Sequence, residues 1–113
     1  LVLPGGPAVF ELRKNESFLH LIKDFSDLHR PIAAICAAPL LLQDLGLLAG
    51  KRATGHESIS NELPGLHSNQ AVIKDGKIIT SRGAGTAIEF GLSLVELLCG
   101  SVKAEEIRAS IHA

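Results

Sequence analysis

Short apolar runs alternate along this chain with longer stretches in which apolar residues recur every third or fourth position. The short runs are typical of buried strands, and the recurring spacing is typical of amphipathic helices. The predicted strands are 1–3, 32–35, 71–73 and 77–81. The predicted helices are 15–29, 37–48, 87–99 and 103–111. This alternation of strands and helices predicts an α/β fold with a mainly parallel sheet.

The segments between these elements carry turn signals. Asp75-Gly76 separates the third and fourth predicted strands and predicts a β-hairpin. Pro4-Gly5-Gly6-Pro7 follows the first strand and predicts a tight turn. Residues 53–56 are interpreted as the end of a short extended piece, and residues 57–68 as a loop or a short helix.

The composition limits the classes of function. Of the 113 residues, 46% are hydrophobic, which is enough for the core of one small domain. The formal net charge is −1, from 11 basic and 12 acidic residues, so neither nucleic acid nor an anionic membrane is expected as a partner. No apolar stretch approaches the roughly 18 residues needed to span a bilayer.

The two cysteines, Cys36 and Cys99, are too few for a disulfide framework. Neither has a Cys or His neighbour at metal-ligand spacing, so no metal site is expected. Both lie in apolar segments, which suits a reducing compartment and predicts a cytoplasmic protein. The glycine-rich loop 81–86 lacks the spacing and the lysine of a phosphate-binding loop, so nucleotide binding is not favoured either.

The first residues, Leu1-Val2-Leu3-Pro4-Gly5-Gly6, lie in the middle of a strand pattern, without a charged leader or a signal-peptide pattern. A buried strand at the first residue predicts that a preceding segment belongs to the same domain. Residues 1–113 are therefore interpreted as the C-terminal portion of a single domain.

The main chemical candidate is Cys36, which lies where the apolar run 32–35 meets the predicted helix 37–48. A residue at a sharp strand-to-helix turn is held clear of the backbone, next to free N–H groups that favour a negative charge. A thiol in this position is expected to ionise more readily than a free one. The alternative is that Cys36 is a small buried hydrophobe, which is the more frequent role of an isolated cysteine in an apolar stretch.

His56 is the best candidate partner for Cys36 among the five histidines, because it follows an extended piece in a turn that contains glycine. An imidazole accepts a proton or stabilises a thiolate near neutral pH. Sites in open α/β sheets gather at the carboxyl ends of the strands, so the turns at Gly5-Gly6, Cys36 and His56 are expected to meet at one edge. The alternative for His56 is an ordinary surface histidine.

Other candidate residues offer polar groups to a substrate. Gly5, Gly6 and Ala37 are candidates to present free backbone N–H groups to an oxyanion, and Arg82 is a candidate to attract an anionic substrate group. An ordinary β-turn and a solvated surface arginine are the alternatives.

Five segments in this order resemble the ThiJ/PfpI superfamily, and most closely its Parkinsonism-associated deglycase branch, which includes the bacterial YajL-like proteins. The cysteine motif and the glycine loop are together specific, and the resemblance extends over essentially all 113 residues. The segments are Val2-Leu3-Pro4-Gly5-Gly6, Ala33-Ala34-Ile35-Cys36-Ala37-Ala38-Pro39, Thr54-Gly55-His56, 72–76 and 80–90.

The resemblance implies a flavodoxin-like three-layer α/β sandwich, usually found as a homodimer. It implies that Cys36 is the nucleophile, easily oxidised to a sulfinate, that His56 is the nearby histidine, and that Gly5, Gly6 and Ala37 line the cysteine pocket. The implied activity is that of a cofactor-independent glyoxalase or deglycase, acting on methylglyoxal-type carbonyls or glycated groups and protecting against oxidative stress. The alternative role is that of a redox-sensing chaperone, in which the cysteine is a sensor.

The chain also departs from the family pattern. Ala84 stands where the family's glycine loop usually has proline. The first strand and helix of the family domain are missing, and with them the glutamate that hydrogen-bonds the cysteine sulfur, so a separate N-terminal polypeptide is an expected partner. Peptidases of the superfamily carry histidine directly after the cysteine, and because Ala37 stands there, proteolysis is disfavoured.

Overall fold

The computed structural model describes residues 1–113, and its four strands form one sheet in the order β1-β2-β4-β3. The strands β1, β2 and β4 run parallel, and β3 pairs antiparallel with β4 across the turn Gly76-Lys77, with Asp75 as the last residue of β3. The bounds are β1 (Val2–Leu3), β2 (Ile32–Ile35), β3 (Val72–Asp75) and β4 (Ile78–Ser81). The predicted α/β class, the mainly parallel sheet and the hairpin are therefore confirmed.

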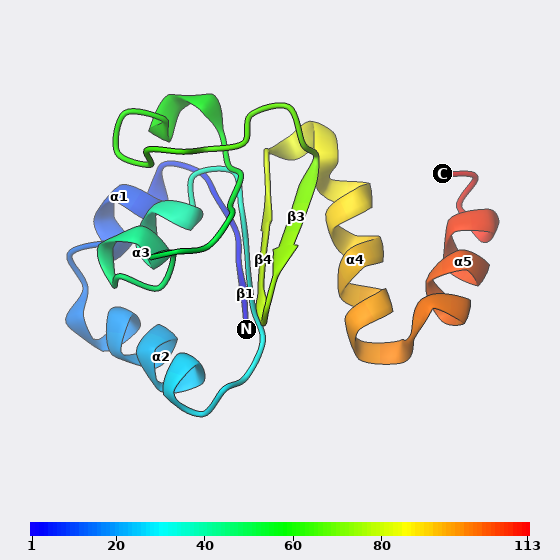
Figure 1. The fold of residues 1–113 in the computed structure, drawn as a ribbon, viewed down its shortest axis with the longest axis horizontal. Helices are drawn as coiled ribbons and strands as arrows, with labels where there is room; N and C mark the ends of the chain where they lie inside the picture. The colour runs from blue at the N-terminus through cyan, green and yellow to red at the C-terminus, as the bar shows by residue number, and fades with distance from the viewer.

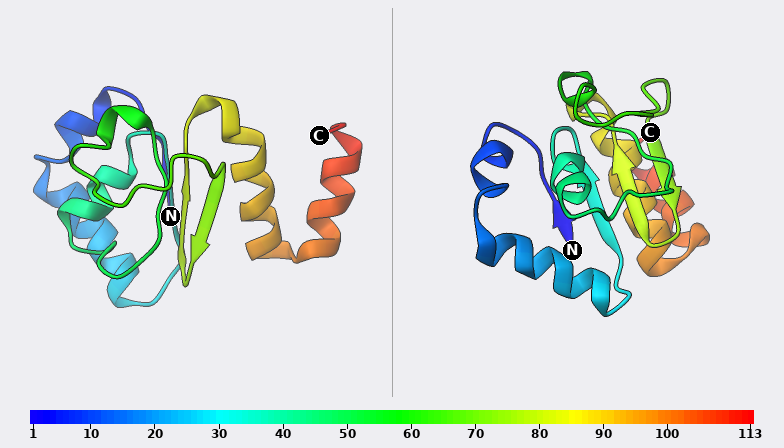
Figure 2. Two further views of the ribbon diagram at one scale, coloured as in Figure 1. Left: turned by 45° about the horizontal axis from the view of Figure 1, so that its top comes forward. Right: turned by 60° about the vertical axis from the view of Figure 1, so that its left-hand side comes forward.

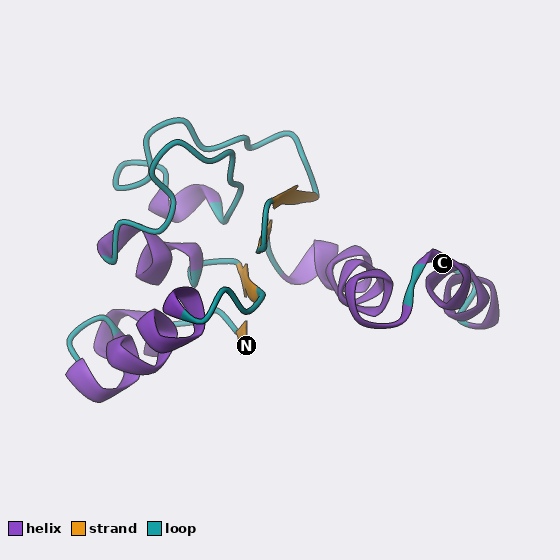
Figure 3. Ribbon diagram, turned by 60° about the horizontal axis from the view of Figure 1, so that its bottom comes forward, coloured by secondary structure: helices purple, strands orange, loops and turns teal.

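Helices cover both faces of the sheet (Figure 1). On one face lie α1 (Ala8–Leu12), α2 (Glu16–Asp27) and α3 (Pro39–Asp44), and on the other lies α4 (Ala87–Cys99). The last helix, α5 (Ser101–Ser110), packs on the outer side of α4 and is separated from the strands by it, as Figure 3 shows. Two short 3-10 helices complete the fold: η1 (Glu57–Ile59) and η2 (Ala84–Thr86).

Strand β2 is buried on both of its faces because helices cover the sheet on each side. Ile32 and Ala34 face the larger core, which also contains Leu3, Val9, Ile22 and the buried leucines of α3. Ala33 faces the smaller core with Ile79 of β4 and Phe90 of α4. Alternate residues of one strand thus serve the two faces, as strand geometry requires. The left view of Figure 2, in which the top comes forward, shows the same layers side by side.

Two helix ends follow the expected chemistry. The Asn15 side chain caps α2 by accepting a hydrogen bond from the backbone N–H of Phe18 at 3.0 Å. Gly100 follows α4 with a φ of +90°, a left-handed conformation that glycine adopts without steric cost. None of the helices is both long enough and apolar enough to cross a bilayer.

The structure corrects three details of the predicted elements. The helix predicted for 37–48 covers only Pro39–Asp44, because Ala37 and Ala38 form the turn that follows Cys36 and proline occupies the first helical position. Residues 53–56 belong to no strand. The helix α1 was not predicted, since its five residues, Ala8–Leu12, are too few to establish a period.

Arg13 joins α3 to the loop that follows η1. Its guanidinium donates to both carboxylate oxygens of Asp44, at 2.9 and 2.8 Å, and to both oxygens of Glu62, at 3.2 and 2.9 Å. The hydrogen bonds to Asp44, and then those to Glu62, raise the pKa of the Arg13 guanidinium above its usual value. Bidentate geometry with two acceptors makes this the strongest ion-pair network of the molecule.

Replacing Arg13 with methionine is therefore expected to lower the free energy of unfolding by about 1 kcal/mol and the melting temperature by about 4 °C. Thermal melts followed by circular dichroism measure this, and the difference should shrink in about 1 M salt, which screens the pairs. Lys103→Met is the matched control, because Lys103 pairs only with Glu106 on the exposed side of α5. Equal losses in the two variants would contradict a special role for Arg13.

Candidate functional site

Cys36 occupies a strained turn directly after β2. Its φ is +65°, in the left-handed region that costs a residue with a Cβ about 1–2 kcal/mol. The backbone holds it there: the Cys36 N–H donates to the carbonyl of Ser81 at 3.0 Å, and the Cys36 carbonyl accepts from the His56 N–H at 2.8 Å. Strain that is held in place from two sides is typical of functional positions.

Gly5 lies against this turn. A Cβ at position 5 would stand 2.6 Å from the Cys36 Cβ, 2.9 Å from the Ile35 carbonyl oxygen and 3.2 Å from the Ala37 nitrogen. Real Cβ atoms essentially never approach another atom within 3.0 Å, so the first two contacts allow only glycine where the chain after β1 approaches the cysteine. The turn after β1 and the turn after β2 are therefore in direct contact.

Three backbone N–H groups in the turn after β1 and the turn after β2 donate no hydrogen bond within the protein. They belong to Gly5, Gly6 and Ala37, of which Ala37 is buried. Since buried amides are almost always paired, an unpaired group beside a thiol is available to a ligand. These are the residues that the sequence singled out as oxyanion donors.

The segment that carries His56 is extended but is held by side chains instead of a strand ladder. The Thr54 N–H donates to the Thr80 hydroxyl at 2.9 Å, and the Thr54 hydroxyl donates to the His67 carbonyl at 2.7 Å. Gly55 then allows close approach to the cysteine turn, because a Cβ there would stand 3.1 Å from the Cys36 carbonyl oxygen. The backbone of His56 is thereby fixed beside Cys36.

Sequence reasoning missed Thr80 and Thr54, which position His56. Both are completely buried, and β4 is buried at all four of its positions. The hydroxyls that end the predicted strand 77–81 were the available signal, because a polar group buried in a strand requires a partner.

Arg82 and His56 line the same open cleft, with a volume of about 540 Å³. Its other walls are Glu57 and the loop that contains η2. The Thr86 hydroxyl stabilises the loop that contains η2. It accepts a hydrogen bond from the Gly83 N–H at 3.1 Å and lies 2.7 Å from the hydroxyl of Ser81. The Arg82 side chain is exposed and forms no ion pair.

The turns at Gly5, Cys36 and His56 therefore meet at the carboxyl edge of the parallel strands, at the upper end of the sheet in Figure 1. Cys99, in contrast, is an exposed free thiol at the end of α4 and does not lie on the apolar side of the helix.

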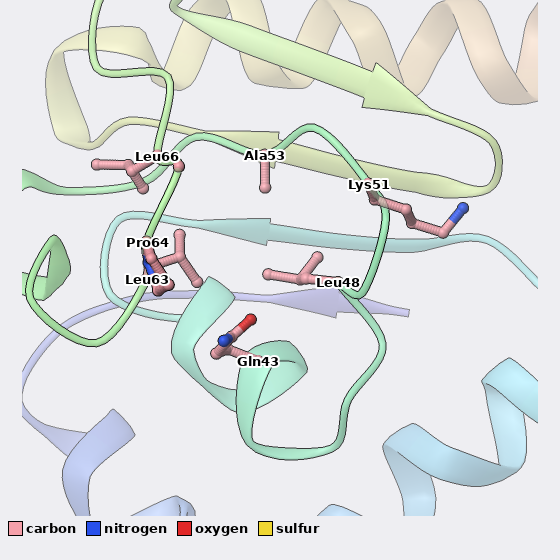
Figure 4. A pocket seen from close by; sticks show the side chains of 8 residues that line it. Gln43, Leu48, Lys51, Ala53, Leu63, Pro64 and Leu66 are labelled. Carbon is pink, nitrogen blue, oxygen red and sulfur yellow. The ribbon is translucent and has the colours of Figure 1, made fainter.

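A second hollow lies between α3 and the loop after η1 (Figure 4). Leu48, Ala53 and Leu63 belong to its wall, and its volume is about 30 Å³. A space of that size holds water but no substrate, and it contains no nucleophile. The cysteine edge consequently combines a nucleophile with free backbone donors, and His56, whose backbone N–H binds the Cys36 carbonyl, borders the open cleft.

Comparisons with known proteins show the family to which the chain is similar. The model of the DJ-1/PfpI family matches residues 1–97. The Drosophila melanogaster protein dj-1beta is 39% identical over 111 residues, which cover 95% of this chain and 59% of the relative. An isonitrile hydratase from Pseudomonas putida is 32% identical over 115 residues, covering 99% of this chain and 50% of that enzyme.

Solved structures agree as well. The crystal structure of Drosophila DJ-1beta superimposes with a TM-score of 0.92 at 35% identity, over 99% of this chain and 62% of that one. The structure of oxidized Toxoplasma gondii DJ-1 superimposes with a TM-score of 0.85 at 33% identity, over 95% of this chain and 60% of that one. This chain thus spans about three-fifths of the length of these solved relatives.

The flavodoxin-like fold expected from the sequence is confirmed by these structures. The family contains enzymes, of which the isonitrile hydratase is one. The matched segment includes the cysteine turn, the His56 segment and the glycine loop. The chain belongs to the DJ-1/PfpI family.

Proposed function

We propose that Cys36 is the nucleophile of a cofactor-independent glyoxalase or deglycase that acts on methylglyoxal-type carbonyls or glycated groups. The observation that carries this proposal is the strained left-handed turn at Cys36, which is packed against Gly5 and surrounded by unpaired backbone N–H groups. Such a site combines a thiol with preorganised donors for a developing oxyanion, which is the requirement for covalent attack on a carbonyl.

With methylglyoxal the proposed reaction begins when the Cys36 thiolate attacks the aldehyde carbon. A C–S bond forms, the carbonyl electron pair moves to oxygen, and this oxyanion takes a proton to give a hemithioacetal. A proton then moves from the former aldehyde carbon to the neighbouring carbon, and the hydroxyl proton moves to the former ketone oxygen, which gives a thioester. Water hydrolyses the thioester, lactate leaves and the thiolate is regenerated, so that no external oxidant or reductant is consumed.

The roles of the surrounding residues follow from their places in the site. The N–H groups of Gly5, Gly6 and Ala37 stabilise the oxyanion. Arg82, exposed and free of ion pairs in the cleft, attracts an anionic part of a glycated substrate. His56, whose backbone N–H donates to the Cys36 carbonyl, acts on the oxygen or the sulfur.

We further propose that a segment outside these 113 residues supplies the carboxylic acid that moves the proton. Two facts support this proposal: the chain spans only 62% of the Drosophila structure, and β1 lies at an open edge of the sheet. Val2 is 51% exposed there, beside an apolar hollow of about 60 Å³ lined by Leu1, Ala33, Leu94 and Leu98. An unpaired edge with an apolar border suits the addition of a strand.

We also propose that the protein is a cytoplasmic homodimer. Proteins of this family are commonly dimeric. Both cysteines of the chain are free thiols, which suits a reducing compartment.

A redox-sensing chaperone is the second candidate function. The observation that favours it is that Cys36 is a partly exposed free cysteine, and susceptibility to oxidation increases with exposure. A peptidase is disfavoured, because Ala37 directly follows the cysteine and offers no base.

The test is the conversion of methylglyoxal by the protein purified under native conditions from its own cells, with lactate followed by proton NMR in the absence of glutathione. Intact mass spectrometry of the same sample reports any accompanying polypeptide. Sustained lactate production supports the enzyme. Suppression of aggregation that is abolished by peroxide, without lactate production, would instead support the sensor and overturn the proposed enzyme.

A further inference from the structure

His56 uses one of its two ring nitrogens to cap a helix. Its Nδ1 accepts a hydrogen bond from the backbone N–H of Ser58 at 3.1 Å, at the first turn of η1, and lies 2.8 Å from the Ser58 hydroxyl. A backbone N–H only donates, so the nitrogen that faces it must offer a lone pair. Nδ1 therefore carries no proton in this arrangement.

We infer that neutral His56 is held as the tautomer protonated on Nε2, and that Ser58 is the positioning residue that selects it. The assignment of the tautomer follows from the capping contact alone. Only its consequence for the reaction rests on the proposed function. In a neutral imidazole one nitrogen donates and the other accepts. With Nδ1 committed as the acceptor, Nε2 is the donor.

The orientation of the ring supports the same assignment. A Cβ on Gly83 would stand 3.6 Å from the His56 Cδ2, so the Cδ2 edge of the ring lies over the glycine loop. Turning the ring by 180° would place the Cδ2–H group against the Ser58 N–H, a contact between two hydrogens with no acceptor. The orientation in the structure is thus the one that satisfies the cap.

Nε2 itself makes no hydrogen bond within the protein, although His56 lines the open cleft beside Arg82. The groups that face the cleft are therefore the Nε2–H donor of His56 and the guanidinium of Arg82. His56 presents no basic nitrogen there. The proposed reaction has two moments at which such a donor helps, the oxyanion of the hemithioacetal and the enediolate formed when the proton moves. The proton acceptor in that step must then be another group.

Two substitutions distinguish the roles of the two ring nitrogens. In His56→Gln the side-chain amide reaches the position of Nε2 and restores a donor there. In His56→Asn the shorter amide occupies the position of Nδ1, where its oxygen accepts from the Ser58 N–H and keeps the cap. Turnover of methylglyoxal is expected to fall less than about tenfold in His56→Gln and about 10²-fold in His56→Asn, the effect of losing one oxyanion donor.

The opposite ranking, with asparagine active and glutamine inactive, would overturn the inference by assigning the catalytic work to Nδ1. Equal activity of both variants with the wild type would also overturn it, because no donor at either position would then matter. The loss in His56→Asn is expected in kcat, with little change in KM, since the donor acts on charge that appears during the reaction.

The tautomer has a readout that does not depend on activity. In the native protein at about pH 8.5, where imidazole is normally neutral, ¹⁵N NMR of the His56 ring should show Nε2 bonded to hydrogen and Nδ1 bare. Ser58→Ala keeps the backbone N–H and should keep this pattern. Ser58→Pro removes the only hydrogen bond that this N–H makes and should give a mixture of the two tautomers.

A wild-type spectrum with the proton on Nδ1 would overturn the inference, whatever the activity. The proposed function fails on a different observation, the absence of turnover in the native protein. The two failures are therefore distinguishable.

Discussion

Replacing Cys36 with alanine is expected to lower the turnover of methylglyoxal to lactate by at least about 10³-fold, to the level of the buffer reaction. Cys36 carries the only thiol at the carboxyl edge, and the removal of this nucleophile also removes the benefit of the donors arranged around it. The measurement is the initial rate of lactate formation by proton NMR at saturating substrate, with the native protein and the variant compared in the same buffer.

Cys99→Ala is the matched control, since Cys99 is an exposed thiol at the far end of α4 and should leave the rate unchanged. A thermal melt of Cys36→Ala separates chemistry from folding, because alanine also carries a Cβ and keeps the strain of the +65° backbone angle. A Cys36→Ala variant that folds normally and retains turnover would eliminate Cys36 as the nucleophile and with it the proposed mechanism.

Much of the site was predictable because it depends on local rules. The apolar run 32–35 followed by Cys36 predicts a residue at the carboxyl end of a parallel strand, and sites in open α/β sheets gather at that edge. Gly5 after the first strand follows the same rule. The structure places Gly5 and Cys36 in contact. The rule about strand ends does not predict this contact, which is possible because residue 5 has no side chain.

The remaining parts depend on contacts between distant segments. The segment that carries His56 is held by Thr80, 24 positions after His56 in the chain. The Thr80 hydroxyl accepts from the Thr54 N–H, where a neighbouring strand would otherwise do so. The spacing of apolar residues along the sequence does not predict a hydrogen bond between such distant segments. The capping of η1 by an imidazole was equally hidden, since the usual capping residues are Ser, Thr, Asp and Asn.

The start of α3 illustrates a conflict between propensity and geometry. Ala37 and Ala38 have high helix propensity and were predicted as helical. The left-handed turn at Cys36 requires two residues to redirect the chain before Pro39 fixes the first helical φ, so the helix begins later. Propensity is a weak preference compared with the hydrogen bonds that Ser81 and His56 make to the cysteine backbone.

Gly5→Ala is expected to disrupt both stability and function, because the added methyl group has no space. Its Cβ would stand 2.6 Å from the Cys36 Cβ and 2.9 Å from the backbone oxygen of Ile35, and neither neighbour can move without shifting the turn. Overpacking of this kind costs about 2 kcal/mol, or a fall in melting temperature of about 8 °C. Displacement of Cys36 by a fraction of an ångström should in addition reduce turnover about 10²-fold.

The matched control is Gly91→Ala in the middle of α4. A Cβ at position 91 meets no atom within 4 Å, so the variant should gain about 0.5–1 kcal/mol from the higher helix propensity of alanine. Thermal melts and the lactate assay on the two variants therefore measure opposite signs of stability change for the same chemical substitution. If Gly5→Ala melted like the wild type and kept its activity, the first turn would not be packed against the cysteine as described. The oxyanion role given to the Gly5 amide would then have no structural basis, because that role depends on the same close approach.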